Sequence, residues 1–539
     1  MSQAGLHKQK QLIASLLDPA VYPHQAKTVQ LIETHISWVL LAGRYAYKIK
    51  KALNLGFLDA TALESRQHFC NEELRLNRRL APQLYLGVVS IGGSHACPEW
   101  NSQPAIEYAV KMRRFASAKT FDHLIVRGKI DDRHMDALAN TLVHFHSGLP
   151  SAADDANASY VMAVHSALEQ NFSQLSGLLP DAADAANMAA LQQASERAYR
   201  ACEHLIAERQ AQGFVRECHG DLHLGNIALI GNNPTPFDGI DFNPSLRRID
   251  VIDEASFLFM DLLHHRRPDL AYRFLNAYLE QTGDYAGVDL LNFYCAYRAT
   301  VRAKVNAIRA SQSSTSNVGR TSVRHVGLKP DLQQSTLTCR NYLTLASDCL
   351  APRQPRLLIT HGLPGSGKST FAQAALERLG AIRLRSDVER KRLFGLSALE
   401  NSRTDQNIYS ADATQRTYAH LLATARALLS AGYTVIVDAA FLKQNERELF
   451  RKLAEDARAP FAIASMQADA TTLRARIRQR QALSNDASEA DLDVLKKLQA
   501  AQEPLSAQET RYTATFNDGT NYESAWRALE KLLHGPALS

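Results

Sequence analysis

Cysteine is scarce in this sequence and is not arranged for metal binding or disulfide formation. The 539 residues include seven cysteines, and no two of them form a C-x-x-C pair. An odd and dispersed set argues against a disulfide framework and against a zinc site, and it is typical of reduced thiols. We therefore expect a cytoplasmic protein.

Long apolar runs are missing as well. No stretch approaches the roughly 18 apolar residues of a membrane span. Near the N-terminus, Lys8 and Lys10 precede a short apolar segment over residues 12–17, but no small-residue cleavage site follows. Neither a secretory signal nor a membrane partner is expected.

The sequence also lacks a charge imbalance strong enough to indicate a particular class of binding partner. Its net charge is +6, with 45% of the residues hydrophobic and 22% charged. This is the composition of a globular protein, and the length allows about three to four compact units. A mildly basic balance suits an enzyme that handles phosphates and does not by itself indicate nucleic acid.

A G-x-G-x-x-G loop, which protein kinases close over nucleotide phosphates, is also missing, and this argues against a protein kinase. The chain nevertheless has the kinase spacing H-x-D-x-x-x-x-N, from His219 through Asp221 to Asn226. Phosphoryl transfer needs a carboxylate near the acceptor hydroxyl and ligands for Mg²⁺ on the nucleotide. The spacing therefore predicts Asp221 as the catalytic carboxylate and Asn226 as a metal ligand.

The next residues predict how a second metal ligand reaches this loop. An apolar run over residues 227–230, a Gly-Asn-Asn turn and a second apolar run ending at Asp241 form a predicted hairpin. Asp241, at a strand end, would then face Asn226 across the ion. The alternative is an Asp- and Asn-rich turn between two buried strands, because these are ordinary turn residues.

A strand over residues 45–50 is predicted to supply the lysine that kinases use to bind the α- and β-phosphates. Alternation places Lys48 and Lys50 on the same face of this strand. We prefer Lys48, and Lys50 stays open. The alternative is a solvated lysine on an edge strand, where lysine is common.

A helix over residues 62–80 should supply the glutamate that pairs with this lysine, as kinases require. Glu73 precedes Leu76 and Leu80 by three and seven residues, so it lies on the apolar stripe of the helix. We therefore prefer Glu73 to Glu72.

Three further segments of the first half are assigned from composition and pattern. Residues 157–212 predict an antiparallel pair of amphipathic helices, with a share in acceptor binding as the less favoured alternative. Asp250 is predicted to anchor its loop structurally. The stretch 311–334, rich in Ser, Thr, Asn and Gly, predicts a mobile loop.

The second half opens with a phosphate-binding loop of the form G-x-x-x-x-G-K-S. A short apolar strand over residues 356–360 runs directly into it, and a helix begins near its end. Glycines let backbone N–H groups approach the phosphates, Lys368 reaches the β- and γ-phosphates, and the Ser369 hydroxyl ligates Mg²⁺. The predicted nucleotide-binding residues here are Gly362, Leu363, Pro364, Gly365, Ser366, Gly367, Lys368, Ser369 and Thr370.

The residues after this loop predict a kinase. Asp387 follows a second strand and suits a base for an acceptor hydroxyl, and Arg390 suits a clamp on the acceptor. Asp438 ends a third strand and could hold the metal through water. Arg476 and Arg480, four residues apart, could bring a helical lid onto the transferring phosphate. The alternative for these arginines is a solvated basic helix.

The first half resembles the aminoglycoside phosphotransferase branch of the kinase fold through residues 219–226 and Asp241. In that family Asp221 would be the catalytic base, and Asn226 and Asp241 would be the Mg²⁺ ligands. The second half is similar to P-loop small-molecule and polynucleotide kinases through residues 362–370, with Asp387, Arg390 and Asp438. The combination resembles bacterial proteins described as bifunctional aminoglycoside phosphotransferase/ATP-binding proteins. The mildly basic charge gives no support for a polycationic acceptor.

We therefore expect an α+β protein-kinase-like domain of the aminoglycoside phosphotransferase type over residues 1–350, with its small lobe at about 1–115 and its large lobe at about 116–350. An α/β P-loop kinase domain with a parallel sheet should follow over residues 351–539. The leading hypothesis is a phosphotransferase with two sites that use ATP and Mg²⁺ on small hydroxyl-bearing molecules, GTP being the alternative nucleotide.

Two other functions stay open from the sequence. One half could be a nucleotide-binding regulatory module for the other. The second half could phosphorylate polynucleotide 5′-hydroxyls, but aromatic residues are few among its arginines, so nucleic acid is not the expected partner. The pattern identifies neither the acceptor nor the oligomeric state.

Overall fold

The chain forms two units, as defined by internal contacts. Unit 1 comprises Met1–Arg266 and Leu290–Leu350, and unit 2 comprises Arg267–Asp289 and Ala351–Ser539. The segment Arg267–Asp289, which sequence reasoning placed in the first domain, therefore groups with the second. The computed structural model describes residues 2–34, 36–54, 59–151, 159–179, 181–315, 332–398, 400, 408, 410–483, 491–518 and 522–535.

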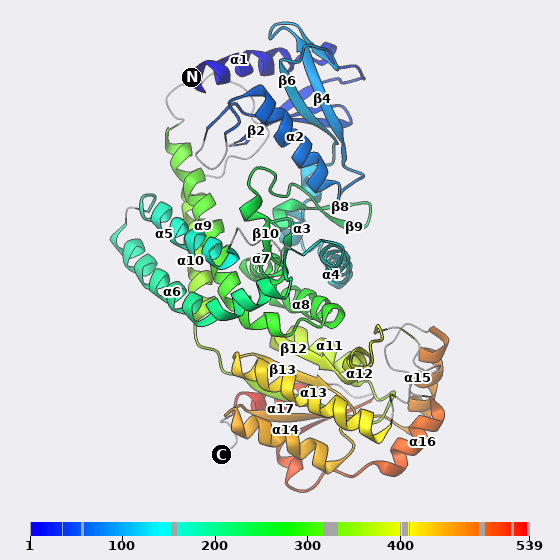
Figure 1. Cartoon of the computed structure of the whole chain (residues 1–539). Helices are drawn as coiled ribbons and strands as arrows, with labels where there is room; N and C mark the ends of the chain where they lie inside the picture. Colours follow the sequence, from blue (N-terminus) through cyan, green and yellow to red (C-terminus); the bar gives the residue numbers. More distant parts are fainter. Residues whose placement is uncertain are drawn as a thin grey trace. The chain divides into compact units, whose positions relative to one another are not determined.

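The small lobe of unit 1, drawn in blue in Figure 1, has an antiparallel sheet and, among its described residues, the α-helices α1 and α2. Its order within the described residues is β1-β2-β3-β6-β4-β5. The elements are α1 (Ser2–Ser15), β1 (Val29–Glu33), β2 (Ser37–Ala42), β3 (Tyr45–Lys50), α2 (Leu63–Asn77), β4 (Tyr85–Gly93), β5 (Pro98–Trp100) and β6 (Glu107–Arg113).

The lysine strand β3 lies inside this sheet, between β2 and β6. Tyr47 and Ile49, on one face, are buried in a cluster with Leu12 of α1. Lys48 and Lys50 therefore lie on the opposite face, and both are buried. The alternative of a solvated lysine on an edge strand is wrong, because both edges of β3 are paired.

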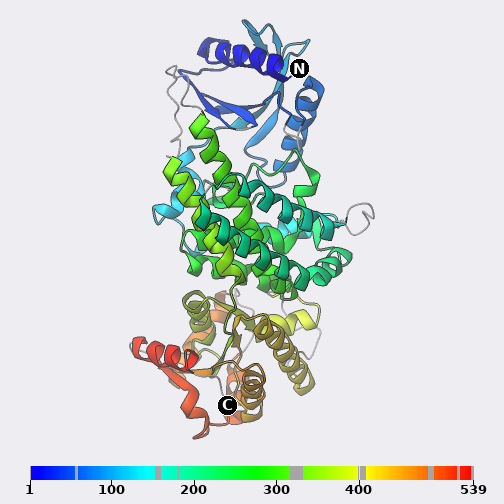
Figure 2. The ribbon, with the colours of Figure 1, turned by 90° about the vertical axis from the view of Figure 1, so that its left-hand side faces the viewer.

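The large lobe is mainly helical. The predicted pair over residues 157–212 is present as α5 and α6, which contact each other. Two further helices, α9 and α10, lie side by side in both views (Figure 1 and Figure 2). The helices are α3 (Phe121–Val126), α4 (Asp132–Ser147), α5 (Tyr160–Ser176), α6 (Ala182–Ala211), α7 (Val251–His264), α9 (Leu291–Thr315) and α10 (Leu332–Leu350).

The loop predicted over residues 311–334 is only partly described. Helix α9 extends to Thr315 and α10 begins at Leu332, so the ends of that stretch are helical. The residues between them lie outside the described part of the chain.

The predicted hairpin is present but shorter than expected. Strand β8 (Ile227–Ile230) pairs with β9 (Asn233–Pro236), and the strand ends there. Pro236 cannot donate a ladder hydrogen bond, and Asp238 has a φ of 63°, outside the extended region. Asp241 therefore lies in an irregular segment and not at a strand end. A second small ladder pairs β7 (Val215–Glu217) with β10 (Arg248–Asp250).

Unit 2 contains the predicted parallel sheet, with described strand order β12-β13-β11-β14-β15 and parallel pairing throughout. The strands are β11 (Arg356–His361), β12 (Ala381–Arg385), β13 (Thr434–Asp438), β14 (Phe461–Gln467) and β15 (Thr513–Asn517). The helices are α8 (Pro268–Thr282), α11 (Lys368–Leu379), α12 (Ser386–Leu393), α13 (Ala411–Ser430), α14 (Gln444–Asp456), α15 (Ala470–Leu483), α16 (Leu492–Ala501) and α17 (Glu523–Leu533). None of the described helices is both long enough and apolar enough to span a lipid bilayer.

Candidate active sites

Two lysines and three carboxylates form the centre of the candidate site in unit 1. Glu73 of α2 accepts from both lysines: Lys48 Nζ lies 2.9 Å from its Oε1, and Lys50 Nζ lies 2.6 Å from its Oε2. Each lysine also has a partner of its own. Lys48 Nζ lies 2.5 Å from Asp238 Oδ1, and Lys50 Nζ is paired with Asp241 Oδ2.

The two lysines differ in how firmly they are enclosed. The side chains of Lys50, Glu73 and Asp241 are 4%, 1% and 6% exposed, so this trio is sealed. The Asp238 side chain, in contrast, is 45% exposed. One partner of Lys48, Asp238, is therefore accessible to water, whereas both partners of Lys50 are buried.

These contacts explain the protonation of the cluster. Burial alone would raise the pKa of Glu73, but the charges of Lys48 and Lys50 outweigh it and lower the pKa to about 2. Burial lowers the pKa of Lys50, but Asp241 and Glu73 reverse this and raise it to about 12. Burial also raises the pKa of Asp241, against the opposing charge of Lys50. Glu73 and Lys50 are therefore charged at neutral pH.

Asp221 and Asn226 lie together, as the motif predicts. Asn226 Nδ2 donates to the Asp221 carbonyl oxygen and to its Oδ2, each at 3.0 Å. His223 Nε2 lies 3.6 Å from the same Oδ2. Burial raises the pKa of Asp221, but His223 and the Arg302 guanidinium together hold it well below its usual range. Asp221 is thus an anion that can accept a hydrogen bond from a hydroxyl group.

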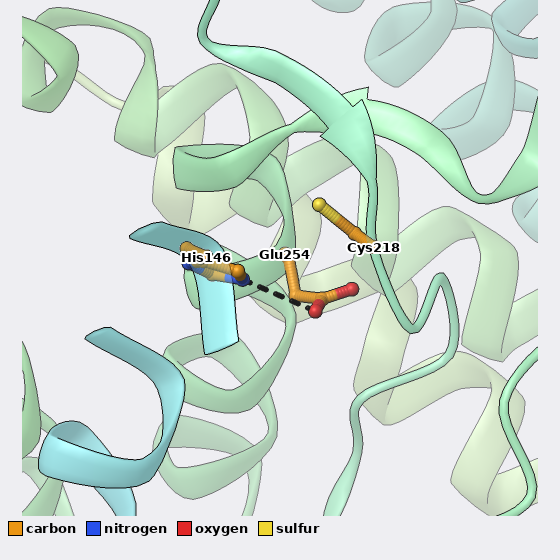
Figure 3. A group of neighbouring side chains, drawn as sticks. All are labelled: His146, Cys218 and Glu254. Atoms are coloured by element: carbon orange, nitrogen blue, oxygen red, sulfur yellow. Dashed lines mark hydrogen bonds and ion pairs between the residues drawn. The ribbon is translucent and has the colours of Figure 1, made fainter. Parts of the chain in front are cut away.

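A buried glutamate of α7 holds the start of this loop. The Glu254 carboxylate accepts from the backbone N–H of His219 at 2.8 Å and from that of Gly220 at 2.8 Å. His146 Nε2 lies 3.2 Å from Glu254 Oε1, and Cys218 lies beside the same carboxylate (Figure 3). By donor type the three side chains could hold a metal, but the Glu254 oxygens already bind these N–H groups. Burial keeps the Cys218 pKa well above its usual value. We therefore interpret the cluster as an anchor for the loop.

Two more carboxylates at the start of α7 are used in the same way. Asp253 makes two 2.7 Å contacts with Arg298, whose Nη1 donates to the Gly220 carbonyl oxygen at 3.2 Å. Asp250 makes contacts of 2.7 and 2.8 Å with Arg209 and caps α7. This geometry agrees with the structural role predicted for Asp250.

The phosphate loop in unit 2 joins β11 to α11, as predicted. Gly362, Gly365 and Gly367 have φ values of 145°, 82° and 95°, which only glycine adopts without strain. A Cβ on Gly362 would lie 2.6 Å from the Met466 carbonyl oxygen. Lys368 begins α11, and its Nζ donates to the Leu363 carbonyl oxygen at 2.9 Å.

Several buried polar groups around this loop have incomplete hydrogen bonding. Burial lowers the pKa of Lys368 to about 8, although the charges of Asp438 and Asp387 oppose the shift. Asp438 is 5% exposed, and neither its Oδ2 nor the Ser366 Oγ has a hydrogen-bond partner among the described residues. Such atoms are costly to bury, so this donor set fits a phosphate and a hard cation.

The remaining predicted residues lie on α12 and α15. Asp387 is in the first turn of α12. Arg390 is 7% exposed and donates from Nη1 to the Ile408 carbonyl oxygen at 2.9 Å. Arg476 Nη1 donates to the Gly365 carbonyl oxygen at 3.4 Å, and the charge of Arg480 acts on Lys368. The structure thus brings Arg476 into contact with the phosphate loop and places Arg480 near enough for its charge to affect Lys368.

Sequence reasoning missed three features of the unit 1 site. It chose between Lys48 and Lys50, whereas Glu73 binds both. It did not single out Asp238, although Asp238 lies three residues before Asp241. It also did not name Arg302, because no local pattern links α9 to Asp221.

Together these arrangements define the class of protein: a kinase-like domain fused to a P-loop kinase-type domain, as the sequence predicted. Residues 357–505 match the family described as an AAA domain, and this range includes the phosphate loop, Asp387 and Asp438. The protein is a phosphotransferase of the kinase class.

The chain belongs to the family of an uncharacterized protein from Mycobacterium tuberculosis. That relative is 31% identical over 465 residues, which are 85% of this chain and 88% of the relative. A protein from Mycobacterium bovis matches with the same values.

Two solved structures are also similar. A choline kinase from Cryptosporidium parvum is 10% identical, with 64% of this chain and 95% of that chain covered and a TM-score of 0.37. An APS kinase from Mycobacterium tuberculosis is 20% identical, with 34% and 100% covered and a TM-score of 0.25.

Proposed function

We propose that this chain uses ATP and Mg²⁺ at two separate kinase-type sites, each of which phosphorylates a small hydroxyl-bearing molecule. The observation that supports this most directly is that each unit has lysine beside carboxylates, buried in unit 1 and half-buried in unit 2. In unit 1 Lys48 and Lys50 meet Glu73, and in unit 2 Lys368 is influenced by Asp438 and Asp387.

In the unit 1 site we assign different tasks to the two lysines. Lys50 holds Glu73 and Asp241 together, because all three side chains are sealed from water. Lys48 contacts the nucleotide phosphates, since its partner Asp238 is half-exposed and can be displaced by a stronger anion.

The acceptor and the metal would use the other predicted residues of unit 1. Asp221 orients the acceptor hydroxyl and accepts its proton. Asn226 and Asp241 would hold Mg²⁺, which neutralises charge on the phosphates when it is bound. Glu254 keeps the loop that carries Asp221 in place through the N–H groups of His219 and Gly220.

In the unit 2 site the glycine-rich turn binds the phosphates through backbone N–H groups, and Lys368 supplies the positive charge. Ser369 and Asp438 would hold Mg²⁺, which the unpartnered Asp438 oxygen supports. Asp387 accepts the proton of the second acceptor, and Arg476 lies at the loop where the transferred group would pass.

The test is to remove each site separately in the full-length chain. Asp221→Asn and Lys368→Ala are compared with the exposed-site controls Asp456→Asn and Lys496→Ala. Wild type and variants are incubated with labelled ATP, Mg²⁺ and pools of metabolites and sugars. We expect each site variant to remove a different part of the phosphate incorporation and the controls to remove none. Full incorporation after one site change would favour a nucleotide-binding regulatory role for that unit.

A further inference from the structure

The outer edge of β12 is completed by a side chain and not by a strand. Strand β12 is the last in the sheet order, and no strand within the described residues pairs with its outer side. Instead, Asn276 of α8 donates from Nδ2 to the Ala381 carbonyl oxygen at 2.8 Å and accepts from the Arg383 N–H at 2.6 Å. A neighbouring strand would bind these same two groups. Asn276, only 2% exposed, therefore replaces it.

One turn later on α8, Glu280 continues the same contact surface. Arg383 Nε donates to Glu280 Oε1 at 2.8 Å, and Arg385 Nη1 lies 3.6 Å from Glu280 Oε2. Arg383 also reaches the phosphate loop, since its Nη1 donates to the Ser369 carbonyl oxygen at 3.5 Å. Glu280 thus orients an arginine that joins β12 to the start of α11.

The end of α8 is tied to α12. Arg392 Nη2 donates to the Glu280 carbonyl oxygen at 2.5 Å. Gly283, with a φ of 73°, ends α8, and a Cβ there would lie 2.6 Å from Arg392 Nη1. Asp387 lies in the chain between Arg383 and Arg392, so the backbone that carries it is held by α8 on both sides.

From these contacts we infer that α8 contributes to catalysis at the unit 2 site, with Asn276 and Glu280 as positioning residues. They fix β12 and the start of α12, and thereby set Asp387 relative to the phosphate loop. This inference rests on the function proposed above for the unit 2 site. A fragment that begins at residue 351 lacks these groups, although it contains every motif of the P-loop domain.

A positioning role makes a different prediction from general stabilisation. The glycines and Lys368 that bind nucleotide come from the β11–α11 turn, so ATP binding should survive the loss of Asn276. Misplacing Asp387 should lower kcat, because the alignment of the acceptor or water is lost. A purely structural role would instead lower activity only in proportion to the folded fraction.

The experiment uses the full-length chain with Asp221→Asn as background, which leaves Mg·ATP turnover to the unit 2 site. Asn276→Ala removes both contacts with β12, and Asn276→Asp retains the acceptor for the Arg383 N–H. The control is Gln281→Ala, on the exposed side of the same helix. For Asn276→Ala we expect kcat to fall about 10- to 100-fold, with the KM for ATP within about twofold. We expect a smaller fall for Asn276→Asp and none for the control.

Amide hydrogen exchange provides a readout that does not depend on turnover. Exchange over residues 381–393 should become faster in Asn276→Ala, with no change over residues 219–230. The inference is overturned if exchange over 381–393 is unchanged, or if kcat falls only as the folded fraction falls. If Lys368→Ala leaves the background turnover intact, the proposed function fails instead, and the exchange comparison still decides the role of α8.

Discussion

The division of labour between the two lysines predicts opposite effects for two similar substitutions. Lys50→Met leaves Asp241, only 6% exposed, without its lysine partner. Removing one member of a buried ion pair costs about 3–5 kcal/mol, which for a domain of this size lowers Tm by about 5–15 °C. Lys48→Met leaves Glu73 paired with Lys50, and Asp238 can be hydrated, so its cost is about 1 kcal/mol.

The effect on activity should not follow the effect on stability: Lys48→Met costs little stability but should lower activity strongly. A charge-assisted hydrogen bond to phosphate is worth about 1.5–3 kcal/mol, so Lys48→Met should lower kcat/KM about 10- to 150-fold while the protein stays folded. The assay combines thermal unfolding with ATP-dependent phosphorylation in a Lys368→Ala background, which silences the unit 2 site. Lys111→Met, on the neighbouring strand β6, is the control. The reasoning is refuted if Lys50→Met is as stable as Lys48→Met, or if Lys48→Met keeps full activity.

Three further results are expected. The pKa of Lys368 is about 8, and phosphate binding favours its charged form. Above pH 8, nucleotide binding at unit 2 should therefore take up a proton, and the affinity should fall about tenfold for each pH unit. Calorimetry in buffers of different ionisation enthalpy measures this uptake, and an affinity independent of pH would contradict it. Asp438→Asn should raise the Mg²⁺ concentration needed for turnover at unit 2 about 10- to 100-fold with little change in Tm, and an unchanged Mg²⁺ titration would exclude Asp438 from the metal site. The pKa of Glu254 is lowered to about 2 by His146, His219 and the Gly220 N–H against the effect of burial. Its ionisation therefore contributes about 3 kcal/mol that is fully present above pH 4.5 and lost as the pH falls toward 2. Glu254→Gln should thus be less stable than wild type at pH 7, by less than half as much at pH 3, and nearly equal at pH 2. A stability difference that does not change with pH would show that the charge is irrelevant.

Much of the unit 1 site could be predicted, because the relevant signals are local. The spacing between Asp221 and Asn226 places both on one loop, and alternation along β3 places Lys48 and Lys50 on one face. The apolar stripe of α2 pointed to Glu73, which is the glutamate that meets the lysines. The hairpin was predicted too long, since the β8–β9 ladder ends at Pro236, before Asp241.

The residues that could not be predicted lie far in the sequence from the residues that they contact or influence. Arg302 influences Asp221 from α9, and Glu254 binds the loop from α7. Asn276 completes β12 although more than 100 residues separate them. A sequence motif cannot predict such pairs, because a buried hydrogen bond requires a distance and a direction in space but no fixed spacing in the sequence.

The class of chemistry was therefore readable from the chain alone. A phosphate loop and a kinase catalytic loop are short segments whose function depends on residues close together in the sequence, so their characteristic spacing can be recognised there. The partners of each charge, and the membership of the segment Arg267–Asp289 in unit 2, followed only from folding. Burial makes an unpaired charge or an open strand edge costly, and the groups that satisfy them can come from any part of the chain that packs there.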